Sequence, residues 1–269
     1  MIAHTGVDHV AVGVVGAVAV ALYGAGWLRL AHPSAVRLWA WIGGVALVVV
    51  ASLPFMEALA QDSFSGHMVQ HLVVIIAAAP LLVLARPVHT LTTAGWMPLT
   101  AFGRRTGVLW HRWAPALGPG LFLVVMFATH LTPIYDDALG NRWLHETEHA
   151  AYLLSACAMW AAVVGVRRTG AAARVAAVFG VIALSSFLGL ILMAAARPLM
   201  PTYEARLGFD HALSDQRSAA AIMWVTGLLT TLPLLVAAVW RWASAEEQMA
   251  RRAESLADHA ARRAAASRN

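Results

Sequence analysis

The chain has 269 residues, of which 60% are hydrophobic and only 12% are charged, so it is too apolar for a soluble domain of this length. Its 19 basic residues are all Arg, and with 14 acidic residues they give a formal net charge of +5. The one cysteine, Cys157, excludes an intramolecular disulfide and a Cys-x-x-Cys metal site.

Seven mainly apolar segments follow one another along the chain, each of about 20 residues, the length at which a helix crosses roughly 30 Å of hydrocarbon. They lie near residues 9–30, 36–56, 67–86, 117–134, 146–166, 173–196 and 217–240. The first basic side chain, Arg29, comes at the end of the first segment, which predicts a retained span and not a cleaved signal peptide. We therefore predict an all-α integral membrane bundle of seven transmembrane helices over residues 1–240.

Residues 241–269 form a different kind of segment. They are rich in Ala and Arg, and Glu247 and Arg251 stand four positions apart, a spacing that stabilises a solvated helix. We expect a cytoplasmic helical tail that continues the last span.

The arginines predict the orientation, because basic residues near short loops stay on the cytoplasmic side. One set of alternate loops, together with the tail, holds 15 of the 19 arginines. The opposite set holds four, which are Arg142, Arg197, Arg206 and Arg217. This asymmetry places the N-terminus outside and the C-terminus in the cytoplasm, and it explains the pI of about 10.3 without a nucleic-acid partner.

Five histidines lie near the outer ends of three predicted spans. His67 and His71 stand four residues apart where the third span begins, His130 is in the last turn of the fourth, and His145 and His149 stand four apart where the fifth begins. Residues at i and i+4 share one helix face. Because ionisable side chains in a membrane are expected to face the bundle interior, the five histidines predict a metal site on the outer side.

Nearby methionines favour copper as the metal. Imidazole binds zinc, copper and iron, whereas a thioether favours Cu(I). Met68 is adjacent to His67, and Met193 and Met223 lie toward the outer ends of the last two spans. We therefore expect Met68 and Met223 to complete a Cu(I) site. The other histidines predicted to lie outside, for which we expect no such role, are His4, His9 and His211.

Four stretches resemble the CtaG-type cytochrome c oxidase assembly proteins. They are "SFSGHMVQHLVVIIAAAPLLVLARP" (63–87), "THLTPIYDDAL" (129–139), "HETEHAAYLL" (145–154) and "LSDQRSAAAIMW" (213–224). The His-Met-x-Gln-His element followed by Ala-Pro-Leu-Leu is the most specific of these, and the resemblance extends from the second span to the seventh. The chain has Ala219, Ala220 and Ala221 where a Gly-Gly pair is expected, a departure that leaves the packing of the seventh span open and removes no candidate ligand.

The resemblance implies a seven-span protein of the bacterial inner membrane that helps to mature a heme-copper oxidase, with a role in copper insertion inferred for the family. The matched polar residues are His67, Met68, Gln70, His71, His130, Tyr135, Asp136, His145, Glu148, His149, Asp215, Gln216, Met223 and Trp224. We expect five of these to orient the metal ligands: Gln70, Asp136, Glu148, Asp215 and Gln216.

The partners implied are an oxidase subunit, membrane lipid and a periplasmic copper carrier, while a homodimer stays open. Metal transfer by ligand exchange makes and breaks no covalent bond of a substrate. We therefore predict a metallochaperone and not an enzyme.

Three other functions share parts of this residue pattern. His145 to His149 fit the His-Glu-x-x-His pattern of zinc proteases, with Glu146 as general base, but the chain lacks a soluble catalytic domain. A seven-span zinc hydrolase similar to alkaline ceramidases would take a carboxylate from Asp136, Asp137 or Asp215, although the seventh span has no His. A heme protein would use His71 and His149 as axial ligands. The hydrolase and the heme protein stay open as alternatives.

Overall fold

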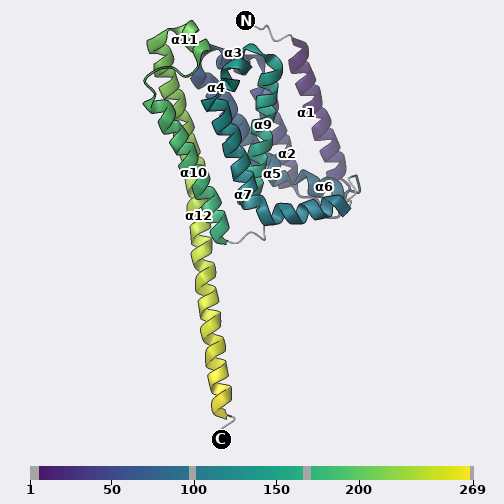
Figure 1. Cartoon of the computed structure of the whole chain (residues 1–269). Helices are drawn as coiled ribbons and strands as arrows, with labels where there is room; N and C mark the ends of the chain where they lie inside the picture. Colours follow the sequence, from purple (N-terminus) through teal and green to yellow (C-terminus); the bar gives the residue numbers. More distant parts are fainter. Residues whose placement is uncertain (1–5, 97–100, 166–170, 267–269) are drawn as a thin grey trace.

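The computed structural model describes residues 6–96, 101–165 and 171–266. About 90% of the structure is helical, and the described ranges contain no strand, which confirms the predicted all-α class. The helices, drawn in Figure 1, are α1 (Gly6–Trp27), α2 (Ala35–Ala51), α3 (Pro54–Asp62), α4 (Phe64–Leu72), the π-helical η1 (Val73–Ala78), α5 (Ala79–Ala85), α6 (Pro87–Thr93), α7 (Ala101–Leu131), α8 (Ile134–Gly140), α9 (Arg142–Trp160), the π-helical η2 (Ala161–Gly165), α10 (Ala171–Ala194), α11 (Pro201–Leu207) and α12 (Phe209–Ala266).

Several of these helices have the character of membrane spans. Within the described residues, five segments are long and apolar enough to cross a membrane: Val10–Trp27, Phe64–Thr93, Trp113–Leu131, Ala171–Ala194 and Phe209–Ala257. The bent pair α2 and α3 would make a sixth. The segment predicted at 146–166 corresponds to α9 and η2, and α9 is not among the five because its first turns are strongly polar. A membrane protein is supported, while the number seven and the orientation stay predictions.

The predicted second span is broken. The chain turns by 52° between α2 and α3, and Pro54 begins α3, where its missing N–H costs no helical hydrogen bond. The prediction of one helix over 36–56 is therefore wrong at its C-terminal end. The bend sends α3 along the end of the bundle beside α4.

The two ends of the bundle differ (Figure 1). The short helices α3 and α11 lie at one end, which we call the α3–α11 end, together with the start of α1. Helix α6 lies at the opposite end, and α12, which is 58 residues long, extends far beyond the other helices there. Residues 241–266 thus continue the helix of residues 217–240 without a break. Arg167 and Arg168, two of the arginines that predict the orientation, lie outside the described residues.

The third predicted span consists of α4, η1 and α5, and Pro80 explains its π-helical middle. Proline has no N–H and clashes with the carbonyl four residues before it, so the hydrogen bonds upstream widen to the π pattern. In that pattern the carbonyl of Ile75 would need the missing N–H of Pro80. The indole N–H of Trp160, from α9, donates to the Ile75 carbonyl instead at 2.7 Å. The two segments α4–η1–α5 and α9 are thus joined by a polar contact inside the bundle.

The alanines that replace the expected Gly-Gly pair fit their surroundings. Ala219 and Ala220 of α12 are fully buried in the main hydrophobic core. On α10, a Cβ added at Gly189 would make ordinary van der Waals contacts with α12, the Ala220 carbonyl oxygen being 3.8 Å away. The seventh predicted span therefore packs closely against the core with alanines at these positions.

Candidate metal centre

Four imidazoles converge inside the bundle near its α3–α11 end. Helix α4 supplies His67 and His71, and α9 supplies His145 and His149. The ring centroids are 4.4 Å apart within each pair, because i and i+4 share a helix face. Between the helices, His71 and His149 are 5.0 Å apart, and His67 and His145 are 5.4 Å apart. We call these four residues the His cluster.

The atoms that could bind a metal lie close together. Ring nitrogens of His67, His145 and His149 lie within 4.8 Å of one another, and so do ligand atoms of His67, His71 and Glu148. His67 and His71 are almost completely buried, and His149 is partly buried. The arrangement offers two overlapping sets of three ligands that share His67.

Many of these atoms have no hydrogen-bond partner. They are His67 Nε2, both ring nitrogens of His71, His149 Nε2 and both carboxylate oxygens of Glu148. Buried polar atoms without a partner are rare in native proteins and costly in an apolar interior. Since so many of them face one small volume, the residues fit a bound cation.

Helix α9 turns one acidic residue toward the cluster and another away from it. Glu148, predicted to orient the ligands, lies among them, with its Oε1 atom 3.6 Å from His71 Nε2. Glu146, the general base of the protease-like pattern, is exposed. The carboxylate available to a metal on this helix is therefore Glu148.

Aromatic side chains enclose the cluster. Tyr135 of α8 lies 4.6 Å from the His67 ring, and Tyr152 of α9 lies 4.5 Å from the His71 ring. Tyr203 of α11 donates to the Ala60 carbonyl at 2.6 Å and lies 3.4 Å from His67 Nδ1. Burial raises the pKa of the Tyr203 phenol, so its hydroxyl stays protonated as a donor. No spacing in the sequence indicated Tyr203, because it lies alone in a short connecting helix.

His130 lies beside the cluster and belongs to neither set of ligand atoms. Its Nδ1 is 2.8 Å from the Met126 carbonyl and 3.2 Å from the Tyr152 hydroxyl. A carbonyl accepts only from a protonated nitrogen, so the Nδ1–H donates and Nε2 keeps its lone pair. That Nε2 atom is buried without a partner. His130 is therefore prepared to bind a metal through Nε2, at a position separate from the four imidazoles.

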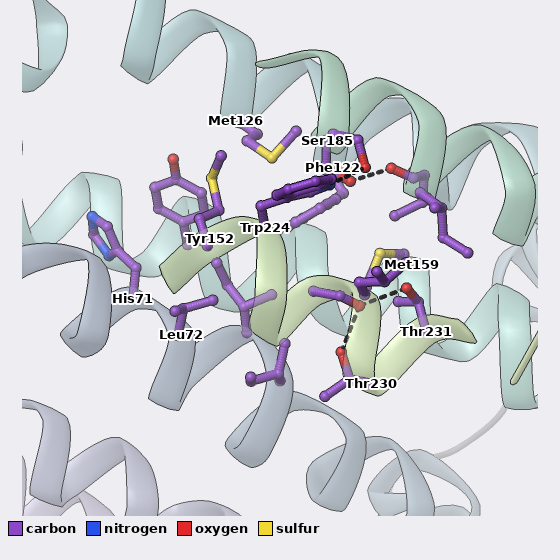
Figure 2. A pocket seen from close by; sticks show the side chains of 18 of the residues that line it. His71, Leu72, Phe122, Met126, Tyr152, Met159, Ser185, Trp224, Thr230 and Thr231 are labelled. Carbon is purple, nitrogen blue, oxygen red and sulfur yellow. Dashed lines mark hydrogen bonds between the residues drawn. The ribbon is translucent and has the colours of Figure 1, made fainter. Parts of the chain in front are cut away.

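A pocket with a volume of about 70 Å³ adjoins the cluster, and we call it the methionine pocket. It runs between α4, α7, α9, α10 and α12, with His71 and Tyr152 at one end and Thr230 and Thr231 at the other (Figure 2). His130 lines it, as do four methionines: Met68, Met126, Met159 and Met223. The predicted soft ligands Met68 and Met223 thus face the same space beside the cluster, whereas Met193 packs against the hydrophobic core.

Asp215 and Asp136, predicted to orient the ligands, bind backbone groups instead. Asp215 of α12 accepts from the N–H of Phe64 at 2.6 Å and of Ser65 at 3.3 Å, and it also accepts from the Ser65 hydroxyl. It therefore caps the N-terminus of α4, where a carboxylate also interacts favourably with the helix dipole. Asp136 accepts from Thr202 N at 2.9 Å and caps α11 in the same way.

The two predicted glutamines also bind other groups. Gln216 accepts from Leu199 N at 2.7 Å and donates to the Leu192 carbonyl at 2.9 Å, which holds the segment between α10 and α11. Gln70 donates to the Ala51 carbonyl at 2.7 Å and to Glu57 Oε1 at 3.1 Å. These contacts position the helices around the cluster and not the imidazole rings.

Glu57 is a residue that the sequence did not single out. It lies on α3, is 8% exposed, and its Oε2 atom is 3.9 Å from His145 Nδ1. In the sequence, the one indication of a role for Glu57 is its position just after an apolar segment. The bend before Pro54, which the sequence pattern does not show, turns it toward the cluster. Of the remaining histidines, His4 and the side chain of His9 lie outside the described residues, and His211 is exposed.

We expect Asp215→Ala to destabilise the protein by about 1–2 kcal/mol, because the first N–H groups of α4 lose their acceptor. Thermal unfolding in detergent measures this as a lower midpoint. Asp210→Ala is the control, since Asp210 is an exposed acid in the first turn of α12. Equal midpoints for the two variants would contradict the capping role.

The comparisons with known proteins agree with the sequence resemblance. A family model described as "Cytochrome c oxidase caa3 assembly factor" matches residues 21–245. The uncharacterized proteins Mb0105 of Mycobacterium bovis and MT0111 of Mycobacterium tuberculosis are each 26% identical over 241 residues, which cover 82% of this chain and 36% of the relative. The uncharacterized protein ML1998 of Mycobacterium leprae is 26% identical over 271 residues, which cover 91% of this chain and 41% of the relative.

The chain thus spans about two fifths of the length of these relatives. No solved structure matches it.

Proposed function

Because the chain belongs to the family of cytochrome c oxidase caa3 assembly factors, we propose that it binds Cu(I) at the His cluster and delivers the ion to an oxidase subunit. Family membership confirms the resemblance to CtaG-type proteins. An oxidase partner follows from the family, whereas copper binding and delivery are our proposal.

The observation that carries the proposal is the group of unpartnered ligand atoms in the His cluster. A histidine with a purely structural role in a buried site is expected to make hydrogen bonds through its ring nitrogens. Here both nitrogens of His71 and the Nε2 atoms of His67 and His149 make none. A bound cation would satisfy these atoms together.

The chemistry around the cluster favours Cu(I). Three or four neutral imidazoles suit copper or zinc, and thioether sulfur adds a preference for Cu(I). The methionine pocket begins at His71 and places Met68 and Met223 beside the imidazoles. Copper held by a few exchangeable ligands can move from imidazole to thioether and then to a docked subunit, without any covalent bond of a substrate being made or broken. The proposed activity is therefore that of a metallochaperone.

The two alternatives fit the geometry less well. Two opposite metal–nitrogen bonds of about 2 Å each would separate axial imidazole centres by more than the 5.0 Å between His71 and His149, so these rings do not suit a heme iron. For a zinc hydrolase, Asp136 and Asp215 cap helices, and Glu148 is the carboxylate that faces the imidazoles. The identity of the bound metal separates the hydrolase from the chaperone.

Elemental analysis of the purified full-length chain tests the proposal. We expect the wild type to bind copper stoichiometrically and the double variant His71→Ala, His149→Ala to bind almost none, because each set of three ligands loses a member. In cells we expect oxidase activity to fall to the level of a strain without the protein. The matched control is His211→Ala, which removes an exposed imidazole and should change neither value.

Each other outcome has a definite meaning. Stoichiometric zinc in place of copper would favour the hydrolase, and an iron porphyrin spectrum would favour the heme protein. Normal oxidase activity in the double variant would contradict the delivery role.

We further propose that all seven predicted segments cross the bacterial inner membrane, with the α3–α11 end facing the periplasm. The arginine asymmetry supports this orientation, since the Arg-rich tail continues α12 at the opposite end. Copper would then reach the His cluster from the periplasm, through a carrier or a free pool.

Cysteine labelling tests the orientation. The test uses Thr132→Cys in a Cys157→Ala background, because Thr132 is exposed between α7 and α8. We expect this cysteine to react with a membrane-impermeant maleimide in cells whose outer envelope is permeabilised and whose inner membrane is intact. Ser255→Cys, on the exposed tail, should react only after lysis. The reverse pattern would place the His cluster on the cytoplasmic side and contradict the proposal.

A further inference from the structure

A second, smaller pocket reaches the His cluster from the α3–α11 end. It has a volume of about 20 Å³ and lies between α3, α8 and α9. Its polar residues are Glu57, Gln61, Arg142 and His145, so one of the four cluster imidazoles forms part of its wall. We call it the access pocket.

Glu57 and His145 are placed so that one cation could bind both. The Oε2 atom of Glu57 is 3.9 Å from His145 Nδ1, which is longer than a hydrogen bond. Metal–ligand bonds of about 2 Å to each atom would span this separation. Both residues are mostly buried, and they come from different helices, α3 and α9.

Gln70 holds the Glu57 carboxylate in this position. Its side-chain amide donates to Glu57 Oε1 at 3.1 Å and to the Ala51 carbonyl at 2.7 Å. One carboxylate oxygen is therefore fixed, and the other is the one nearest His145. Gln70 lies on α4 between His67 and His71, so the same helix positions the carboxylate and half of the His cluster.

From His145 the path continues into the cluster. Ring nitrogens of His145, His67 and His149 lie within 4.8 Å of one another, a distance over which a metal can exchange one imidazole for another. A cation bound to Glu57 and His145 would thus be a single ligand exchange from the set His67, His145 and His149.

The access pocket is lined by one acidic and one basic side chain, Glu57 and Arg142. The Glu57 carboxylate places a negative charge beside His145, which attracts a cation to that point. The basic group in the pocket wall is Arg142, whose guanidinium lies over the Trp143 ring, 5.5 Å from its centroid. Glu146, the neighbour of His145, is exposed on another side of α9.

We propose that Glu57 is the first ligand for the metal on its way from the access pocket to the His cluster, with Gln70 as its positioning residue. This inference rests on the proposed copper-binding function and adds the direction of loading. The ion exchanges its incoming ligands for Glu57 Oε2 and a nitrogen of His145, and then exchanges Glu57 for His67 or His149. The ion keeps its charge throughout, and no electron is transferred.

Loading kinetics of the full-length protein in detergent test the inference. Cu(I) is supplied as its bicinchoninate complex, and the loss of the colour of that complex follows the transfer. We expect Glu57→Gln to slow loading about tenfold or more, while the copper bound at equilibrium stays stoichiometric because the four imidazoles remain. We expect loading of the wild type to slow with added salt, and loading of Glu57→Gln to depend less on salt.

Two further variants make the test specific. Glu146→Gln removes the same charge from an exposed site on α9 and should load at the wild-type rate. Gln70→Leu keeps the charge of Glu57 but releases its carboxylate, and it should load at an intermediate rate.

The outcomes separate this inference from the proposed function. Equal loading rates for Glu57→Gln and the wild type would overturn the inference and leave the copper site intact. Equal slowing by Glu57→Gln and Glu146→Gln would also overturn it, because the effect would then come from net charge. Loss of equilibrium copper together with a lower unfolding midpoint in Glu57→Gln would assign Glu57 a structural role. A wild type that binds no copper would overturn both proposals.

Discussion

A buried polar atom inside an apolar helical bundle has to find its partner within the protein, because neither lipid nor water is there to supply one. Several buried polar groups of the bundle meet this requirement. Gln216 binds two backbone groups, Tyr203 binds a carbonyl of α3, and Trp160 binds the Ile75 carbonyl of the π-helical segment. Among the described residues, six buried atoms without a hydrogen-bond partner belong to the His cluster and Glu148, and further ones are Gln70 Oε1, His130 Nε2 and Tyr135 Oη. This contrast is the physical basis for proposing that a cation binds there.

The polar residues that have hydrogen-bond partners connect the helices that surround the His cluster. Asp215 connects α12 to the first turn of α4, one turn before His67. Asp136 connects α8 to α11, and Tyr203 connects α11 to α3, so the three short helices are joined over the end of the bundle. These hydrogen bonds join α3, α4, α8, α11 and α12 around the cluster, and α9 is joined to η1 by the bond from Trp160 to the Ile75 carbonyl.

Sequence patterns predicted the parts of this site that depend on periodicity within one helix. The i, i+4 spacing of His67 with His71 and of His145 with His149 placed each pair on one helix face. Because exposing ionisable side chains to lipid costs free energy, both faces were predicted to turn toward the bundle interior. Periodicity could not place residues whose position depends on a bend or on a contact between helices. Glu57 reaches His145 only because the chain turns before Pro54, and Asp215 reaches α4 across the bundle. His130 has the right depth, but its hydrogen bond to Met126 turns it toward the methionine pocket.

For the fold, too, sequence patterns predicted some features and not others. Long apolar segments predicted the helices well, while Pro80 and Pro54 set local features that hydropathy does not reveal, namely the π-helical segment and the break after α2. The most direct measurement of the central claim is X-ray absorption at the copper edge on the Cu(I)-loaded full-length protein. We expect scattering from at least two imidazoles, and we expect it to be lost in the variant His71→Ala, His149→Ala. A first shell made only of sulfur, or a spectrum unchanged in that variant, would contradict it.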